Sequence, residues 1–197
     1  MKITLAVPTN RGINPKTMQS LMYLVARGGY DFHIIIPEEG YTIAENRNYS
    51  VVQALNNNSE YLLFIDDDMT FEPTLLDELM ANKKDICGVA YHPRSETMGQ
   101  IVKFLDETHA IRLEDPEIKK NPKYQKTFEC HATGTGIILI KCEVFKTFRP
   151  WFVFEYFDTG QVKLGEDWYF CKLAKQRGFK IFADPRIVCG HIGEKIF

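Results

Sequence analysis

Three consecutive carboxylates form the cluster with the clearest chemistry in the sequence. Asp66, Asp67 and Asp68 directly follow the apolar segment 61–65, which is typical of a buried strand. Adjacent like charges repel unless a positive group lies nearby, and Mg²⁺ or Mn²⁺ suits a carboxylate site shared with phosphates. Side chains alternate along an extended segment, so Asp66 and Asp68 are expected to point the same way. An acidic turn that caps the next helix is the alternative interpretation.

A second acidic pair opens the clearest amphipathic helix of the second half, predicted at 165–177. Asp167 lies three residues before Phe170 and four before Cys171, which places it on the apolar stripe of that helix, next to Glu166. A carboxylate there is either a buried helix cap or a group that faces a cleft. In a cleft, partial shielding from water would give it the basicity that a general base needs.

One histidine stands between glycines after the last apolar segment. The segment 189–193 reads CGHIG, and its glycines indicate a backbone shaped for close approach to His191. Imidazole is a suitable third ligand for Mn²⁺ beside carboxylates. A lone histidine is more often a surface or packed residue, so this signal is weak by itself.

Polar residues also follow the first strand and occupy the second helix. Pro8, Thr9 and Asn10 end the first strand, where an ordinary turn is the alternative to a ligand site. Asn48 is polar on an apolar helix stripe. Arg47 lies beside it, and its guanidinium could clamp a diphosphate, although a solvated surface residue is the alternative.

Three further positions have weaker signals. The segment that holds Gly134, Thr135 and Gly136 leads into a strand, and its glycines would let the backbone approach a sugar; a simple bend is the alternative. Arg94 follows the fourth predicted strand. Trp168 lies off the apolar stripe of its helix and could stack on an acceptor ring or simply pack.

The elements that must position these residues alternate between strand and helix in the first half. Strands are predicted at 3–7, 32–36, 61–65 and 85–91, and helices at 15–26, 42–55 and 73–80. This alternation favours a mostly parallel α/β sheet, and the continuously apolar strands indicate that both of its faces are covered. The carboxyl ends of the strands then share one edge, where open α/β sheets bind ligands.

The second half has a different pattern. A hairpin is predicted at 100–105 and 109–113, an exposed loop at 114–126, and strands at 127–131, 136–141, 179–183 and 187–189. We therefore expect one α/β, Rossmann-like domain over 1–197 with a smaller β-rich second half. The change of pattern divides this domain into two halves, 1–94 and 95–197.

Composition narrows the class of protein. The 197 residues carry 24 basic and 26 acidic side chains, a net charge of −2 that gives no global attraction to nucleic acid or anionic membranes. The five cysteines are scattered without a CxxC pair, which argues against a disulfide framework and a zinc site. No apolar stretch approaches the length of a membrane span. We expect a cytoplasmic protein.

The order of the motifs carries more information than any one of them. They are VPTN at 7–10, AENRN at 44–48, LLFIDDDM at 62–69, ATGTGIILI at 132–140, LGEDW at 164–168 and GHIG at 190–193. In this order the chain resembles the GT-A fold glycosyltransferases, especially compact bacterial and phage-encoded members close to family 2. The resemblance covers most of the chain except roughly 95–127.

The resemblance implies a metal-dependent glycosyltransferase with a nucleotide-sugar donor, a UDP-sugar foremost. Asp66, Asp67 and Asp68 look like the DxD motif, in which Asp66 would hold the ribose or the metal and Asp68 the metal that bridges the diphosphate. His191 would complete the metal shell of Mn²⁺ or Mg²⁺. Asp167 looks like the xED carboxylate that deprotonates the acceptor hydroxyl in inverting members.

The resemblance also implies that 1–94 is the nucleotide-binding half and 95–197 the acceptor and catalytic half, and it assigns the remaining motif residues. The nucleotide would be contacted by residues of the first loop and the second helix: Pro8, Thr9, Asn10, Arg47 and Asn48. The donor sugar would lie against Gly134, Thr135 and Gly136, and the acceptor against Arg94, Glu166 and Trp168. A glycan or a lipid-linked saccharide is the expected acceptor. Modified DNA is the alternative, with Arg94 and the lysines of 119–126 as a basic rim.

Two other functions fit part of the pattern. A sugar nucleotidyltransferase shares a related architecture, but it needs a glycine-rich, basic loop after the first strand, and 7–12 offers only Arg11 and Gly12. A non-catalytic nucleotide-sugar-binding module would not need Asp167 on the inward face of its helix. The sequence does not indicate the oligomeric state.

Overall fold

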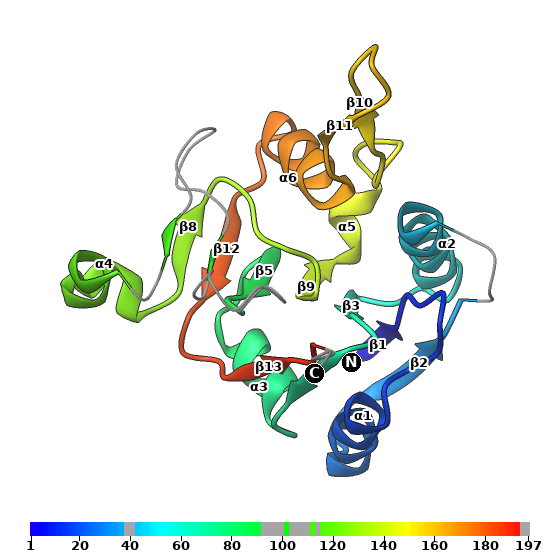
Figure 1. Ribbon diagram of the computed structural model, residues 1–197. Helices are drawn as coiled ribbons and strands as arrows, with labels where there is room; N and C mark the ends of the chain where they lie inside the picture. Colours follow the sequence, from blue (N-terminus) through cyan, green and yellow to red (C-terminus); the bar gives the residue numbers. More distant parts are fainter. Residues whose placement is uncertain (38–41, 92–100, 103–110, 113–114, 194–197) are drawn as a thin grey trace, which may run out of the picture.

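A seven-stranded sheet forms the centre of the computed structural model, which describes residues 1–37, 42–91, 101–102, 111–112 and 115–193. Its strands lie in the order β2-β1-β3-β9-β5-β12-β8 (Figure 1). They are β1 (Lys2–Ala6), β2 (Asp31–Ile35), β3 (Tyr61–Ile65), β5 (Ile86–Val89), β8 (Phe128–Cys130), β9 (Ile137–Lys141) and β12 (Ile181–Asp184).

The sheet is mostly parallel, as predicted. β1 pairs in parallel with β2 and β3, and β12 pairs in parallel with β5. β9 runs antiparallel between β3 and β5, and β8 runs antiparallel to β12 at one edge. Strands from both predicted halves of the chain therefore belong to one sheet. The predicted fold class is confirmed.

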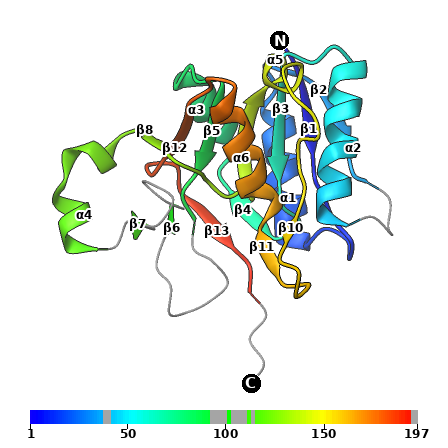
Figure 2. The ribbon, with the colours of Figure 1, turned by 90° about the horizontal axis from the view of Figure 1, so that it is seen from above.

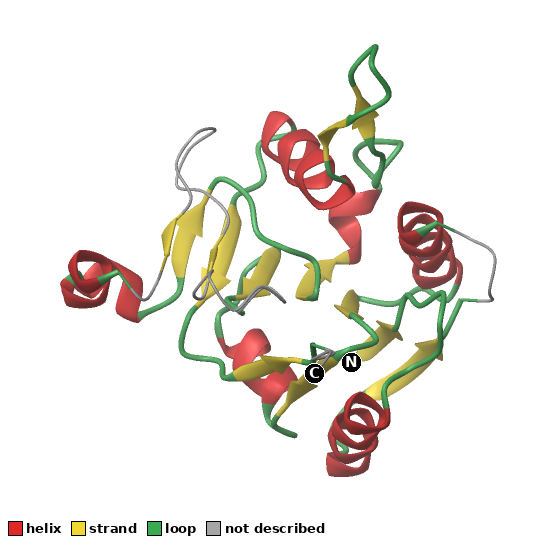
Figure 3. Cartoon of the chain, in the orientation of Figure 1, coloured by secondary structure: helices red, strands yellow, loops and turns green. Residues whose placement is uncertain are grey.

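Helices cover both faces of this sheet (Figure 3). The helices are α1 (Pro15–Arg27), α2 (Ile43–Asn56), α3 (Leu75–Ala81), α4 (Pro116–Lys120), α5 (Cys142–Phe145) and α6 (Glu166–Gln176), with a 3₁₀ turn at η1 (Pro122–Gln125). α1 and α3 pack into one apolar core, and α2, α5 and α6 into the other. None of the described helices combines the length and apolar character needed to cross a bilayer.

The helix starts follow from local sequence. Asn14 caps α1, because its side chain accepts a hydrogen bond from the backbone N of Lys16, and Pro15 takes the first helical position. α2 begins with a capping box in which Thr42 and Glu45 bond each other's backbone N–H groups. These caps place the loop after β1 and the start of α2 at the carboxyl edge of the sheet.

Two short strands extend the site beyond the main sheet. β4 (Met69–Phe71) pairs antiparallel with β13 (Cys189–His191), with His191 opposite Met69. Figure 2 shows both strands together beyond the end of β3. The last strand was predicted at 187–189 but lies at Cys189–His191, because it pairs there with β4, which was not predicted.

Two hairpins complete the described structure. β6 (Ile101–Val102) and β7 (Ile111–Arg112) pair antiparallel, which confirms the pairing of the predicted hairpin within the described residues. β10 (Glu155–Tyr156) and β11 (Val162–Leu164) form a second hairpin directly before α6, and this hairpin was not predicted.

The predicted exposure of 114–126 is confirmed for most of its described part, but the predicted loop is wrong, because two short helical segments form there. Asp115 and Asn121 each cap a short helical segment that has proline at its start, and Tyr124 is buried against Phe128. An Asp-Pro or Asn-Pro pair supplies both a cap and a preset first residue, which favours helix over loop.

Candidate functional site

The acidic triplet forms a turn between β3 and β4, against the loop that follows β1. Thr9 Oγ1 donates to Asp67 Oδ2 at 2.6 Å, and the backbone N of Asn14 donates to the Asp67 carbonyl at 2.9 Å. The expectation that Asp66 and Asp68 project alike from an extended segment is wrong, because residues 67–68 turn. The two carboxylates consequently have different partners.

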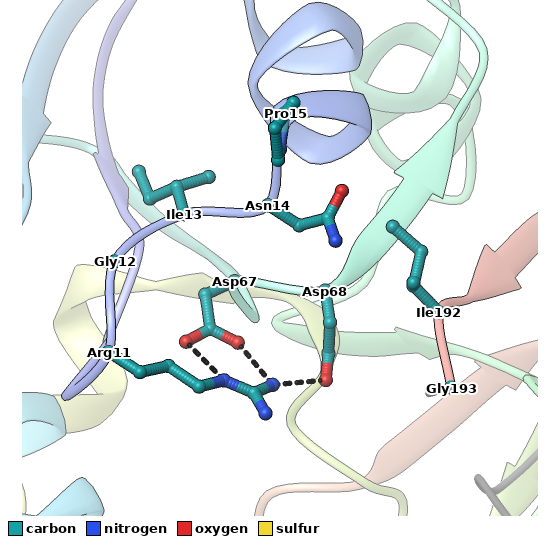
Figure 4. Close-up of a pocket in the computed structure, with 9 residues that line it drawn as sticks. All are labelled: Arg11, Gly12, Ile13, Asn14, Pro15, Asp67, Asp68, Ile192 and Gly193. Carbon is teal, nitrogen blue, oxygen red and sulfur yellow. Dashed lines mark hydrogen bonds and ion pairs between the residues drawn. The ribbon is translucent and has the colours of Figure 1, made fainter. Parts of the chain in front are cut away.

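Arg11 bridges two carboxylates of the triplet. Its Nη2 lies 3.0 Å from Asp67 Oδ1 and 2.8 Å from Asp68 Oδ2, while 54% of the Arg11 side chain stays exposed (Figure 4). Hydrogen bonding to Asp67 raises the pKa of the Arg11 guanidinium. The sequence analysis considered Arg11 only as the basic residue of the loop after the first strand, and did not assign it to the acidic triplet. The pairing could have been predicted from the sequence, because Arg11 follows β1, the acidic triplet follows β3, and parallel neighbouring strands end at the same edge.

His191 meets the acidic triplet at Asp68. Its Nε2 lies 3.2 Å from Asp68 Oδ1, and the backbone N of Ile192 donates to the Asp68 carbonyl at 2.8 Å. The ring of Tyr91 lies edge-on to the imidazole at 5.6 Å. The β4–β13 pairing therefore brings together two residues that are more than 120 positions apart in the sequence.

The Asp68–His191 pair fits two ligands of one divalent cation. Two adjacent ligands of an octahedral ion at about 2.1 Å lie about 3 Å apart, close to the observed separation. One carboxylate oxygen and one imidazole nitrogen suit Mn²⁺. The described residues contain no cluster of three or more His, Cys, Asp or Glu side chains arranged to hold a metal. A cation here would need further ligands from a bound phosphate or water.

Arg47 lies inside the protein and not on its surface. Its side chain is 2% exposed, its Nη2 lies 2.8 Å from Asp66 Oδ1, and its Nε lies 3.5 Å from Glu166 Oε1. The alternative of a solvated surface residue is wrong, while the clamp of Arg47 on a diphosphate stays a prediction, because the guanidinium is paired here with two carboxylates of the protein. Glu166, predicted to face an acceptor, is held by the same ion pair.

The buried face of α2 differs from the predicted one. Asn46, Arg47 and Ser50 are buried, and Asn46 Nδ2 donates to Asn10 Oδ1 at 2.8 Å. Asn48 instead exchanges two hydrogen bonds with the backbone of Phe152, and its contact with the nucleotide stays a prediction. Because α2 has polar residues on its buried face as well as on its exposed face, the sequence pattern did not show which face is buried.

Burial sets the electrostatics of the Arg47 cluster. Burial raises the pKa of both Asp66 and Glu166, while the charge of Arg47 opposes that rise. The guanidinium keeps two carboxylates from different halves of the chain close together in a poorly hydrated place.

Asp167 lies on the buried stripe of α6, as its spacing predicted. Phe170, Cys171 and Ala174 are buried beside it, and Asp167 Oδ1 accepts a hydrogen bond from the backbone N of Trp168 at 2.8 Å. Trp168 packs against the core, with its ring 5.9 Å from that of His131. Both sequence interpretations of Asp167, as a helix cap and as a cleft carboxylate, are compatible with this place.

Tyr91 occupies the space beside the glycines at 134–136. A Cβ at Gly134 would lie 2.2 Å from Tyr91 Oη, and one at Gly136 would lie 2.8 Å away. The backbone N of Gly136 donates to Tyr91 Oη at 3.1 Å. Burial raises the pKa of Tyr91, and the charges of Asp66 and Asp167 add to that rise. The glycines thus accommodate Tyr91, and their contact with a donor sugar stays a prediction.

Two cavities open on either side of Arg11. One of about 290 Å³ is lined by Pro8, Thr9, Asn10, Arg11, Ile43, Asp66, Asp67 and Asp68. The other, of about 490 Å³, is lined by Arg11, Gly12, Ile13, Asn14, Pro15, Asp67, Asp68, Ile192 and Gly193 (Figure 4). Five residues predicted to hold a nucleotide therefore share the first cavity: Pro8, Thr9, Asn10, Asp66 and Asp67. Arg94 lies outside the described residues.

Comparisons with known proteins support the fold. No protein-family model matches the chain, and no curated protein sequence matches it. Among solved structures, A197 from STIV is similar over 98% of this chain and 87% of its own, with 18% identity and a TM-score of 0.67. GalNAc-T7, solved with UDP, GalNAc and Mn²⁺, is similar over 98% of this chain at 12% identity, with a TM-score of 0.68.

A nucleotidyltransferase has a related structure. The inositol-1-phosphate CTP transferase from T. maritima matches 98% of this chain and 89% of its own, with 12% identity and a TM-score of 0.53. The chain spans only 43% of the GalNAc-T7 chain. The fold is thus the GT-A arrangement that the sequence resemblance predicted, and glycosyltransferases and a nucleotidyltransferase both use it.

Proposed function

We propose that this protein is a metal-dependent glycosyltransferase that moves a sugar from a nucleotide-sugar donor, a UDP-sugar foremost, to an acceptor hydroxyl with inversion. One observation carries the proposal. The Asp68–His191 pair and the cavity beside Asp66 lie at the carboxyl edge of the sheet, where the first turn of α6 also holds Asp167. Open α/β sheets bind ligands at this edge.

The donor would bind from the cavity of about 290 Å³ toward Asp68. Asp66, held by Arg47, would receive the ribose, and Thr9 and Asn10 would line the nucleoside. Asp68 and His191 would hold the divalent cation, which when bound neutralises charge on the leaving diphosphate. The similarity to GalNAc-T7, solved with UDP and Mn²⁺, supports this assignment.

Asp167 would act as the general base. Its carboxylate takes the proton of the acceptor hydroxyl as that oxygen attacks the anomeric carbon. The bond between that carbon and the diphosphate breaks, and its electron pair leaves with the diphosphate. Glu166 contributes indirectly, because its ion pair with Arg47 holds the start of α6 against the donor side.

Replacing the proposed base tests the assignment. The Asp167→Asn variant should lose about 10²–10⁴-fold in the rate of sugar transfer, the range for general base catalysis. Its affinity for the nucleotide sugar should stay within a few-fold of wild type. Release of nucleoside diphosphate measures the rate, and calorimetry measures binding. Asp85→Asn is the matched control, because Asp85 is exposed before β5, away from the carboxyl edge. Full activity of Asp167→Asn would rule out this base.

A sugar nucleotidyltransferase is the second candidate. The similarity to the T. maritima CTP transferase, which extends over 89% of that protein, favours it. Such an enzyme joins a nucleoside triphosphate to a sugar phosphate and releases pyrophosphate. Pyrophosphate release with a panel of nucleoside triphosphates and sugar phosphates, without transfer from nucleotide sugars, would replace the first proposal by the second.

For the acceptor we propose a glycan or a lipid-linked saccharide. Modified DNA is the alternative, because Lys119, Lys120 and Lys123 are exposed on α4 and η1. Binding to duplex DNA that weakens steeply with salt would favour the DNA acceptor. We propose a cytoplasmic location, which the five buried cysteines without disulfides support.

A further inference from the structure

Arg11 separates the two cavities at the acidic triplet. Both are lined by Arg11, Asp67 and Asp68. The guanidinium therefore stands where a ligand that extended from one cavity into the other would pass. Its side chain is 54% exposed, so it is held by the two carboxylates on one side only.

The two carboxylate oxygens of Asp68 contact different side chains, His191 and Arg11. Oδ1 lies 3.2 Å from His191 Nε2, and Oδ2 lies 2.8 Å from Arg11 Nη2. A divalent cation on the His191 side would share this carboxylate with the guanidinium. Two positive groups this close repel, and both compete for the same negative charge.

Arg47, at the same edge of the sheet, differs from Arg11 in its burial. The guanidinium of Arg47 is 2% exposed and lies between Asp66 and Glu166, so it is fixed by packing. Arg11 has a long, half-exposed side chain at the rim of both cavities. The edge therefore contains one fixed guanidinium and one that can leave its carboxylates without exposing a core residue.

We infer that Arg11 is a displaceable counter-ion that occupies the carboxylates in the free protein and turns to the diphosphate of the donor when a divalent cation binds. This inference rests on the proposed function. It makes Arg11 a competitor of the cation when no donor is present and a ligand of the donor when both are bound. Cation and nucleoside diphosphate then strengthen each other's binding.

Mn²⁺ binding without turnover tests the inference. We would titrate wild type, Arg11→Gln and Arg27→Gln with Mn²⁺ by electron paramagnetic resonance, with and without UDP. Arg27 is the matched control, because it is also about half exposed and paired with an aspartate, Asp77. Arg11→Gln should bind Mn²⁺ alone about five- to tenfold more tightly than wild type. The factor by which UDP strengthens Mn²⁺ binding should fall at least about fivefold. Arg27→Gln should match wild type in both.

A lysine variant provides a second substitution at the same position, so the test does not depend on Arg11→Gln alone. Arg11→Lys retains the charge but loses the planar fork that bridges two carboxylates. Its Mn²⁺ affinity should lie between those of wild type and Arg11→Gln. If wild type binds Mn²⁺ with UDP and neither Arg11 variant changes Mn²⁺ affinity, the inference is overturned and the proposed function stands. If wild type binds no Mn²⁺ even with UDP, both are overturned.

Discussion

The side chains of Arg47 and Arg11 have the same chemistry and opposite surroundings. Arg47 is enclosed by the core and by two carboxylates, whereas Arg11 meets its carboxylates from the solvent side. A buried ion pair adds little net stability when intact, but removal of one partner leaves an uncompensated charge. In the Arg11 pairs the guanidinium is half exposed and the carboxylates are nearly buried, so water replaces part of what is lost when Arg11 is removed. The consequences of mutation should differ accordingly.

Replacing Arg47 should destabilise the whole protein. Arg47→Met removes the cation and leaves Asp66 and Glu166 buried without it, which should cost about 3–5 kcal/mol in the free energy of unfolding. Urea denaturation at neutral pH measures the change. Arg27→Met, at an exposed ion pair, should change that free energy by less than about 1 kcal/mol. A loss below about 1 kcal/mol in Arg47→Met would contradict the buried ion pair.

The residue types in the sequence indicated the chemistry of the site, but they did not indicate which side chains contact each other. The spacing of Asp167 on its helix correctly predicted the buried stripe of α6. The sequence did not reveal that Arg47 is buried, because an arginine beside an apolar stripe is usually solvated. It also did not reveal Tyr91 as the reason for Gly134, since that contact joins residues 43 positions apart.

At the scale of elements, one polar network joins α3, β8 and β12 away from the acidic triplet. Asp184, at the end of β12, is 1% exposed and accepts hydrogen bonds from Arg186, Asn82 and Thr127. Although burial would raise it, these hydrogen bonds lower the pKa of Asp184 to about 2. The network holds the parallel pair β5–β12 to the edge strand β8.

This network predicts a loss of stability in acid. Between pH 4 and pH 2 the folded protein binds fewer protons at Asp184 than the unfolded chain, so its free energy of unfolding falls as the pH falls. The shift from 3.8 corresponds to about 2 kcal/mol. Asp184→Asn should remove that part of the pH dependence, as measured by urea denaturation across this range. Asp85→Asn, at an exposed carboxylate, should retain it. An unchanged profile in Asp184→Asn would contradict the assignment.

Most elements were predictable in both halves, including β8, β9, α6 and β12 of the second half. The short strands β4, β10 and β11 were not predicted. β1 and β3 are apolar runs, and α1 has a cap followed by a periodic stripe. β4 and β13 have only three residues each and form because they pair with each other. The insertion of β9 between β3 and β5 is a long-range pairing that no local pattern encodes.

At the scale of the whole molecule, one sheet gathers the site from both ends of the chain. The loop after β1, the turn after β3 and the strand β13 meet at the carboxyl edge, where the first turn of α6 holds Asp167. Parallel strands and short connections make this convergence a property of the topology. The fold alone is shared by two kinds of transferase, so ligand specificity must decide between them.

The most direct test of a nucleotide-sugar and metal site is a thermal-shift panel of nucleotide sugars with and without Mn²⁺. A ligand at about 100 times its dissociation constant adds about 2.7 kcal/mol. For a chain of this size that corresponds to a rise in Tm of roughly 5–10 °C. We predict such a rise for at least one nucleotide sugar, a UDP-sugar first, only when Mn²⁺ is present, and its loss in Asp68→Asn. No Mn²⁺-dependent rise with any uridine, guanosine, cytidine or thymidine sugar would contradict the account.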